Sequence, residues 1–157
     1  MPGEPLLLEI AALAVVIAGF TAVTAVLVPP GGTWHPAMRI RQRAVVSTSF
    51  NVMFEALAPS IVFAWLADER AALTVASAGV AVYATVIVMW RGRQFLRAGG
   101  NRTPTMMVLF ALGPTAALLF WANALVFASV AVFALALCIQ LSVAAVSFYS
   151  LVSAAQS

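Results

Sequence analysis

Residues 106–151, MMVLFALGPTAALLFWANALVFASVAVFALALCIQLSVAAVSFYSL, contain no charged side chain. A helix that crosses a membrane needs about 20 apolar residues, because each residue adds about 1.5 Å and the hydrocarbon core is about 30 Å thick. As one helix, this run would extend beyond twice that thickness. We therefore predict that it folds back once, at Phe120-Trp-Ala-Asn123, where Trp121 suits the membrane interface and Asn123 suits a tight turn.

Three further apolar segments precede this run. The predicted spans cover about residues 6–28, 44–66, 71–90, 105–121 and 125–151. The composition agrees with this division, since 64% of the residues are hydrophobic and only 8% are charged, unlike a soluble domain. The sequence therefore predicts an all-α, polytopic transmembrane helical bundle with five spans, in which residues 1–157 form a single transmembrane domain.

Residues typical of helix starts flank these spans. Pro5, Pro36 and Pro104 are expected in the first turns of their helices, where a missing N–H leaves no hydrogen bond unmade. Asp68 follows the second span and is expected to cap the start of the third helix.

The arginines predict the orientation of the chain. The first and third connections are rich in arginine, the second carries Asp68, Glu69 and Arg70, and the fourth carries no charge. By the positive-inside rule the first and third connections are cytoplasmic, the N-terminus is outside and the C-terminus is inside. The absence of lysine and the abundance of alanine, valine and arginine are typical of a GC-rich bacterial gene, so we expect a multi-pass protein of the bacterial cytoplasmic membrane.

Arginine and tryptophan side chains gather on the predicted cytoplasmic side. Arginines bind anionic headgroups while aromatic rings anchor at the same depth. The predicted partners are therefore the bilayer and its anionic headgroups, and nucleic acid is not expected. The residues of this predicted headgroup belt are Trp34, Arg39, Arg41, Arg43, Trp90, Arg91, Arg93 and Arg97.

Glu55 is the central residue of the second span, about 16 Å from either end. An ionised carboxylate at that depth costs several kcal/mol, so the side chain is expected to face protein or water and to be protonated or paired. No arginine lies at a matching depth in the sequence, which makes a neutral, hydrogen-bonding acid the expected state. Gln140, near the middle of the fifth span, is the best partner, with Tyr83 and Asn51 behind it.

Pro59 lies one turn after Glu55 and lacks the N–H that would bond to the Glu55 carbonyl. Thr48, Asn51, Glu55 and Pro59 recur at helical spacing and predict one polar stripe. This pattern is typical of helices that line a cavity or bind an ion. It also fits a structural role, in which one interhelical hydrogen bond fixes the packing of the spans.

Glu9 is a second acid within an apolar segment. It lies near the start of the first span, which favours an interfacial acid near the positive end of the helix dipole. If Glu9 instead faces the bundle, Glu9 and Glu55 would define a half-path from the outside. On the same helix, Ala11, Ala14 and Ala18 begin a stripe of small residues that predicts close helix contact, either within the bundle or between copies in a homo-oligomer.

Signatures of metal sites and enzymes are missing. His35 has no second histidine or cysteine nearby, and Cys138 is the only cysteine, so neither a metal site nor an intramolecular disulfide is expected. Nucleotide-binding, protease and hydrolase motifs are absent, and we predict no cofactor and no enzyme activity. An enzyme of lipid chemistry is disfavoured because the cytoplasmic connections offer arginines without an acid–base pair.

The first third of the chain resembles a set of small bacterial multi-span membrane proteins. The resemblance lies in the first helix, where Glu9 is followed by Gly19-Phe20, and continues through the arginine-rich residues 39–43 to Ser49-Phe50. It implies no particular activity, but it draws attention to Glu9 and the Gly-Phe pair.

Two functions remain after these exclusions. The leading interpretation is a non-enzymatic structural or accessory subunit, a small integral membrane protein with a polar intramembrane site around Glu55. The alternative is an oligomeric proton- or ion-linked channel or transporter that uses Glu55, with Pro59 shaping the site and Asn51, Thr48 and Gln140 as ligands or relays. A homo-oligomer or another membrane protein is the expected protein partner.

Overall fold

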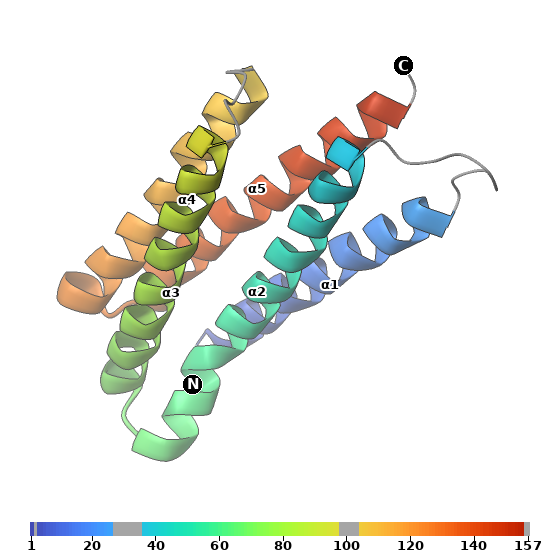
Figure 1. The fold of residues 1–157 in the computed structure, drawn as a ribbon. Helices are drawn as coiled ribbons and strands as arrows, with labels where there is room; N and C mark the ends of the chain where they lie inside the picture. The colour runs from blue at the N-terminus through green and yellow to red at the C-terminus, as the bar shows by residue number, and fades with distance from the viewer. Residues whose placement is uncertain (2, 27–35, 98–103, 156–157) are drawn as a thin grey trace.

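The computed structural model describes residues 1, 3–26, 36–97 and 104–155, with side chains described for residues 1, 3–23, 42–94 and 107–150. In these parts the chain forms five α-helices and one π-helical turn (Figure 1). All five α-helical segments are long and apolar enough to cross a membrane, so the predicted all-α, five-span fold is confirmed. The elements are α1 (Glu4–Val26), α2 (Pro36–Leu66), α3 (Glu69–Arg97), α4 (Pro104–Ala122), η1 (Asn123–Phe127) and α5 (Val130–Ala155).

The predicted helix starts agree with the structure. Pro36 and Pro104 are the first residues of α2 and α4, and Pro5 is the second residue of α1. The backbone N–H of Ala71 donates a 2.8 Å hydrogen bond to Asp68 Oδ1, so Asp68 caps α3 as expected.

The connection between the last two spans differs from the prediction. The chain continues past Asn123 through η1, and α5 begins at Val130 instead of near residue 125. Ala128 adopts a left-handed conformation, and its N–H donates a 2.8 Å hydrogen bond to the Asn123 carbonyl. The turn therefore lies about five residues later than predicted, because a π-helical turn carries α4 onward before the chain reverses.

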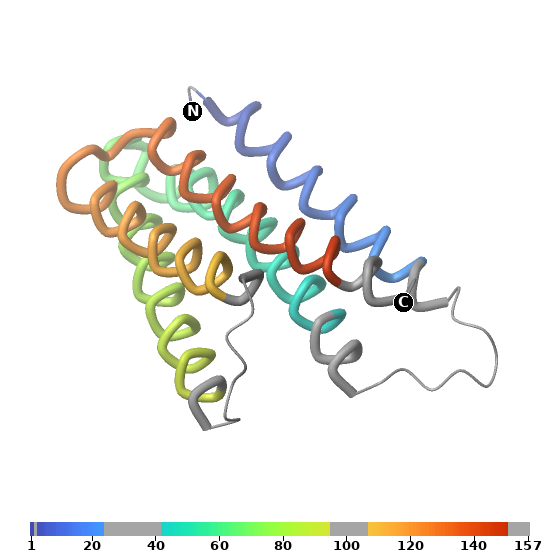
Figure 2. Tube along the Cα trace, turned by 90° about the horizontal axis from the view of Figure 1, so that it is seen from above, coloured from blue at the N-terminus to red at the C-terminus, as the bar shows by residue number. Residues whose placement is uncertain are grey.

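Four helices surround the interior and the fifth packs outside them. α2 contacts α3 and α5, and α4 contacts the same two helices, whereas α3 and α5 touch little. α1 packs on α2 and α5, and within the described residues it does not contact α3 or α4. Figure 2 shows α1 and α4 on opposite sides of α5.

The two ends of the bundle differ in charge. Arg43 near the start of α2 and Arg91 and Arg93 near the end of α3 mark one end, called the arginine end below. Asp68 and Glu69 lie at the opposite end. α3 and α4 diverge from α1, α2 and α5 toward the arginine end (Figure 1).

The tightest packing lies away from the arginine end. Phe120 on α4 and Phe133 on α5 are fully buried, and their rings meet edge to face with centroids 5.2 Å apart. Leu7 on α1 and Val80 on α3 belong to the same buried cluster. Apolar side chains therefore make up most of the interior in this half of the bundle.

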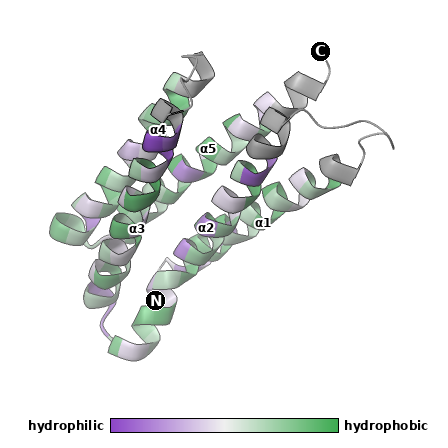
Figure 3. Ribbon diagram, in the orientation of Figure 1, coloured by the Kyte–Doolittle hydropathy of each residue, from purple (hydrophilic) through white to green (hydrophobic). Residues whose placement is uncertain are grey.

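The outer surface is apolar along the length of the helices. Large hydrophobic side chains such as Phe20, Phe54 and Leu118 are more than 60% exposed, and Figure 3 shows hydrophobic colour over most of every helix. A soluble domain rarely exposes apolar surface on this scale, whereas lipid covers it without cost. The surface thus agrees with five membrane-spanning helices.

Candidate intramembrane pocket

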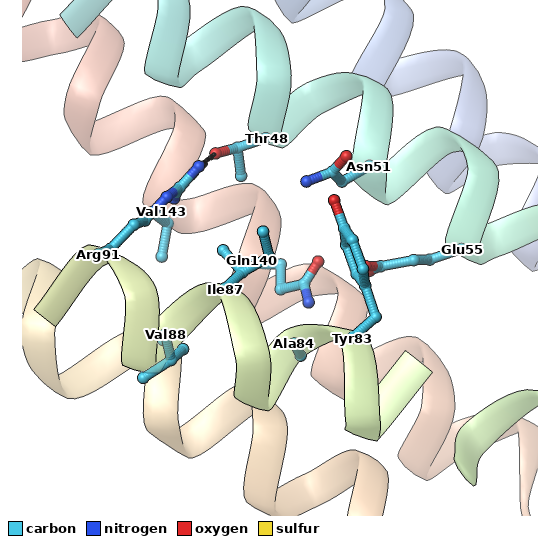
Figure 4. A pocket seen from close by; sticks show the side chains of 11 residues that line it. Thr48, Asn51, Glu55, Tyr83, Ala84, Ile87, Val88, Arg91, Gln140 and Val143 are labelled. Carbon is cyan, nitrogen blue, oxygen red and sulfur yellow. Dashed lines mark hydrogen bonds between the residues drawn. The ribbon is translucent and has the colours of Figure 1, made fainter. Parts of the chain in front are cut away.

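A small pocket lined by both polar and apolar side chains lies between α2, α3, α4 and α5, in the half of the bundle nearer the arginine end (Figure 4). Its volume is about 60 Å³, enough for several water molecules and far smaller than a typical cavity for an organic ligand. The residues that line it are Thr48, Asn51 and Glu55 from α2, Tyr83, Ala84, Ile87, Val88 and Arg91 from α3, Gly113 from α4, and Gln140 and Val143 from α5.

The helical repeat of α2 directs Glu55 into the protein. Thr48, Val52 and Pro59 lie on the same buried side of the helix, while Phe54 is 63% exposed. Glu55 itself is only 7% exposed. The carboxyl group is therefore sheltered from lipid, as the sequence predicts.

Figure 4 shows the side chain of Gln140, the partner expected from the sequence, beside the Glu55 carboxyl group. The Oε2 atom of Glu55 is buried and has no hydrogen-bond partner among the described residues. A buried polar oxygen without a partner is costly, which points to a proton, a water molecule or a ligand as its missing partner.

Pro59 is fully buried one turn further along α2. The helix continues through this proline to Leu66, although Pro59 cannot donate to the Glu55 carbonyl. An acceptor on the backbone therefore accompanies the carboxyl group in the same turn.

Tyr83 and Asn51 lie between Glu55 and the arginine end. Figure 4 shows the Tyr83 ring beside Glu55, with its hydroxyl group directed toward Asn51. Asn51 is half-buried, one turn from Glu55 on the same helix. Their polar groups continue the polar surface from the carboxyl group toward Thr48.

Arg91 turns into the pocket, whereas the sequence analysis placed it in the headgroup belt. Its Nη1 and Nη2 donate to Thr48 Oγ1 at 3.5 Å and 3.4 Å. The side chain is half-buried, while Arg93 is exposed. The helical repeat of α3 indicates this difference between the two arginines. Arg91 lies on the same face of the helix as buried Ala84, whereas Arg93 lies on the same face as exposed Val86 and Trp90.

The pocket is closed beyond Glu55 by the apolar cluster. One turn further from the arginine end, the interior is filled by Val80 from α3, Phe120 from α4 and Leu137 from α5, all buried. The polar surface thus runs from Arg91 to Glu55 and stops at close-packed side chains.

A second buried polar group occupies the other half of the bundle. Asn123 Nδ2 donates a 2.8 Å hydrogen bond to Ser77 Oγ, and Asn123 Oδ1 accepts a 2.9 Å bond from the Ser129 N–H. Asn123 was expected in a turn, and Ser77 was not predicted as a site residue. Only a pairing of this serine with an asparagine far away in the sequence would have indicated it.

The remaining predicted site residues lie elsewhere. Glu9 is exposed on the outer side of α1 and does not line the pocket, so it forms no half-path with Glu55. Ala11, Ala14 and Ala18 are buried within the bundle. Among the belt residues, Arg43, Arg93 and Trp90 are exposed at the arginine end. Trp34 and the side chains of Arg39, Arg41 and Arg97 lie outside the described residues, as does His35.

Comparisons with protein-family models, with curated proteins and with solved structures find no match to this chain. Within the described residues, no three histidine, cysteine, aspartate or glutamate side chains come close enough together to hold a metal ion. The case for a function therefore depends on the pocket itself.

Proposed function

We propose that the chain is a multi-pass protein of the bacterial cytoplasmic membrane that binds and releases a proton at Glu55. The observation that carries this proposal is the buried, unpartnered Oε2 of a carboxyl group that lines a pocket with room for water. Acids inside membrane spans commonly mark proton or ion pathways because burying them is costly without such a use. Protonation would neutralise the group in place, and water in the pocket would carry the proton to it.

Several features favour a proton over a metal cation. Arg91 lines the same pocket, and its positive charge disfavours a metal cation bound there, whereas a proton bound to Glu55 leaves the carboxyl group neutral. Among the residues that the structure describes, Glu55 is the only one with a carboxyl group in the pocket lining, so a cation would have a single acidic ligand there. The small volume excludes a bulky solute.

The positive-inside rule places the arginine end in the cytoplasm. On this orientation Glu55 exchanges protons with the cytoplasmic side, because the apolar cluster blocks the other side. Transport across the whole membrane would require the helices that form the apolar cluster to move apart. In a homo-oligomer, a neighbouring subunit would provide a surface against which these helices could move.

Substitution of Glu55 by glutamine tests the proposal, because glutamine keeps the shape and hydrogen bonding of the acid and removes its titration. Within the described part of the chain, the other groups that titrate or carry charge in the pocket are Tyr83 and Arg91 from α3, while α4 and α5 contribute none and α1 does not line it. In purified protein reconstituted in liposomes, we expect the infrared band of a buried protonated carboxyl group to change with pH in the wild type and to vanish in Glu55→Gln.

Glu9→Gln is the matched control, since it removes an exposed acid from α1. It should leave the Glu55 band in place. The same three proteins should be compared for proton flux in the liposomes, where we expect loss in Glu55→Gln alone. An unchanged carboxyl band in Glu55→Gln would contradict the proposal.

A structural or accessory role is the second candidate, and the position of Glu55 on α2 beside Gln140 on α5 favours it. A hydrogen bond between these two side chains would join α2 to α5 inside the bundle and fix their packing register. On this reading Glu55→Leu disrupts assembly, Glu55→Gln preserves it, and both wild type and Glu55→Gln show equal flux. Size-exclusion chromatography in detergent together with the flux assay separates the two functions.

A further inference from the structure

We propose that Arg91 and Thr48 form a binding site for a phosphate group at the arginine end of the Glu55 pocket. The ligand is either the phosphate of a lipid headgroup or free phosphate, which share the chemistry that a guanidinium group recognises. This proposal goes beyond proton binding at Glu55 and does not depend on it.

In the described part of the chain, Arg91 has no acidic side chain as a partner. Of the five acidic residues in the chain, Glu4, Glu9, Asp68 and Glu69 lie toward the opposite end, and Glu55 lies at the far end of the same pocket without an ion pair to Arg91. Arg91 makes no ion pair within the described residues. A half-buried arginine without an acid is costly, so a negative partner from outside the chain is expected.

The donors of Arg91 and Thr48 point to one place in the pocket wall. Nη1 and Nη2 of Arg91 both approach the Thr48 hydroxyl, at 3.5 Å and 3.4 Å, which are long distances for hydrogen bonds. Thr48 is 7% exposed and is held in place on α2. Two N–H donors and one hydroxyl group thus converge at the pocket wall, and a phosphate oxygen accepts from such groups more strongly than a neutral hydroxyl group does.

Arg91 lies at the membrane depth where lipid headgroups are expected. Arg91 lies in the last turn of the apolar part of α3, which ends at Gln94, with Trp90 beside it. This is the level at which arginine and tryptophan meet lipid headgroups. Because Arg91 turns inward, a phosphate bound to it would lie over the pocket instead of on the outer surface.

Arg91→Gln removes the charge, and Arg93→Gln is the matched control, since Arg93 is two residues along the same helix but exposed and outside the pocket. To test binding of a lipid phosphate, the protein is placed in nanodiscs of phosphatidylcholine, with or without phosphatidylglycerol. It is then extracted, and native mass spectrometry measures the lipid that stays bound. To test binding of free phosphate, inorganic phosphate is titrated into the protein in an uncharged detergent, and calorimetry measures the binding.

We expect Arg91→Gln to lower affinity for at least one of these probes by about tenfold or more, the usual effect of losing charge-assisted hydrogen bonds. Arg93→Gln should lower the same affinity by less than about threefold, since it removes only a screened surface charge. If Arg91→Gln unfolds the protein, Thr48→Val provides a second test, because it keeps the shape of the side chain and removes the hydroxyl group.

Equal weakening by Arg91→Gln and Arg93→Gln would overturn the proposal, because it would indicate a diffuse basic surface. Failure of the wild type to bind either probe would overturn it as well. Neither result bears on proton binding, which Glu55→Gln tests separately.

Discussion

The side-chain amide of Asn123 donates a 2.8 Å hydrogen bond to the hydroxyl group of Ser77, and both side chains are fully buried. The same amide group accepts a hydrogen bond from the Ser129 N–H through its oxygen. One side chain therefore joins the turn between α4 and α5 to α3. The bond lies in an apolar interior, where neither group has water as a substitute partner.

Asn123→Ala should lower the free energy of unfolding by about 2 kcal/mol, because it leaves Ser77 and the Ser129 N–H without their partner. Unfolding by sodium dodecyl sulfate in mixed micelles measures this change. Ser142→Ala is the control, since this exposed serine bonds only to a carbonyl of its own helix, and it should change stability by less than about 0.5 kcal/mol. Equal stability of the two variants would show that the buried bond contributes nothing.

Gln140→Leu tests whether the interaction of Gln140 with Glu55 across the pocket contributes to packing. We expect a loss of about 1 kcal/mol in the free energy of unfolding, the usual scale for hydrogen bonds between membrane helices. Glu55→Gln should stay within about 0.5 kcal/mol of the wild type, because an amide group at residue 55 can still bond to Gln140. Gln94→Leu, at an exposed position on α3, controls for the change in hydrophobicity. A wild-type stability for Gln140→Leu would argue against the structural role.

The membrane-spanning architecture could be predicted because it depends on local properties. Run length and composition determine how many times the chain can cross a bilayer, and proline and aspartate preferences locate helix starts such as Pro36, Pro104 and Asp68. The burial of Glu55 could also be predicted, because placing a carboxyl group in lipid at the middle of a span costs free energy wherever the other helices lie. The position of Gln140 beside Glu55 follows in turn, because few polar side chains share that depth.

The features that sequence reasoning missed depend on contacts between distant segments. Nothing near Asn123 in the sequence indicates that Ser77 is its partner, and η1 extends α4 because that partner holds Asn123 in the interior. Arg91 was grouped with its neighbours in sequence, although the helical repeat places it on a different face from Arg93. The pocket itself arises because α3 and α5 touch little, which no single helix encodes.

Two alanines at the turns adopt left-handed conformations, with φ of 53° at Ala67 and 45° at Ala128. A side chain is strained there, whereas glycine is not. Ala67→Gly should therefore raise the free energy of unfolding by about 0.5 kcal/mol, after the entropy that glycine adds to the unfolded chain is subtracted. Ala67→Val should lower it by about 1 kcal/mol or more, because a β-branched residue tolerates positive φ poorly.

The control for this pair is Ala64→Gly, at an exposed position inside α2. It should lower the free energy of unfolding by about 1 kcal/mol, since glycine weakens a helix interior. Thermal unfolding in detergent micelles separates Ala67→Gly, which should be more stable than the wild type, from the other two variants, which should be less stable. Destabilisation by Ala67→Gly and Ala64→Gly alike would contradict the left-handed conformation at Ala67.

Gly3 precedes α1 with φ of 85° and packs against the first residue of α5. A Cβ atom at this position would lie 2.6 Å from Val130 Cγ1, closer than carbon atoms can approach. Gly3→Ala should lower the free energy of unfolding by about 2 kcal/mol, because both the backbone conformation and the stiff valine oppose the added methyl group. Adding Val130→Ala to Gly3→Ala should recover the share of the lost free energy of unfolding that the clash causes. The share that the positive φ causes should remain.

Gly79→Ala is the matched control, because a Cβ atom on this exposed α3 glycine would meet nothing within 4 Å. Alanine favours a helix over glycine, so this variant should be more stable than the wild type by about 0.5–1 kcal/mol. The two glycine substitutions thus have opposite expected signs, which unfolding in mixed micelles can resolve. If both stabilise the protein, residue 3 does not pack against Val130, and the start of α1 is not held beside the start of α5.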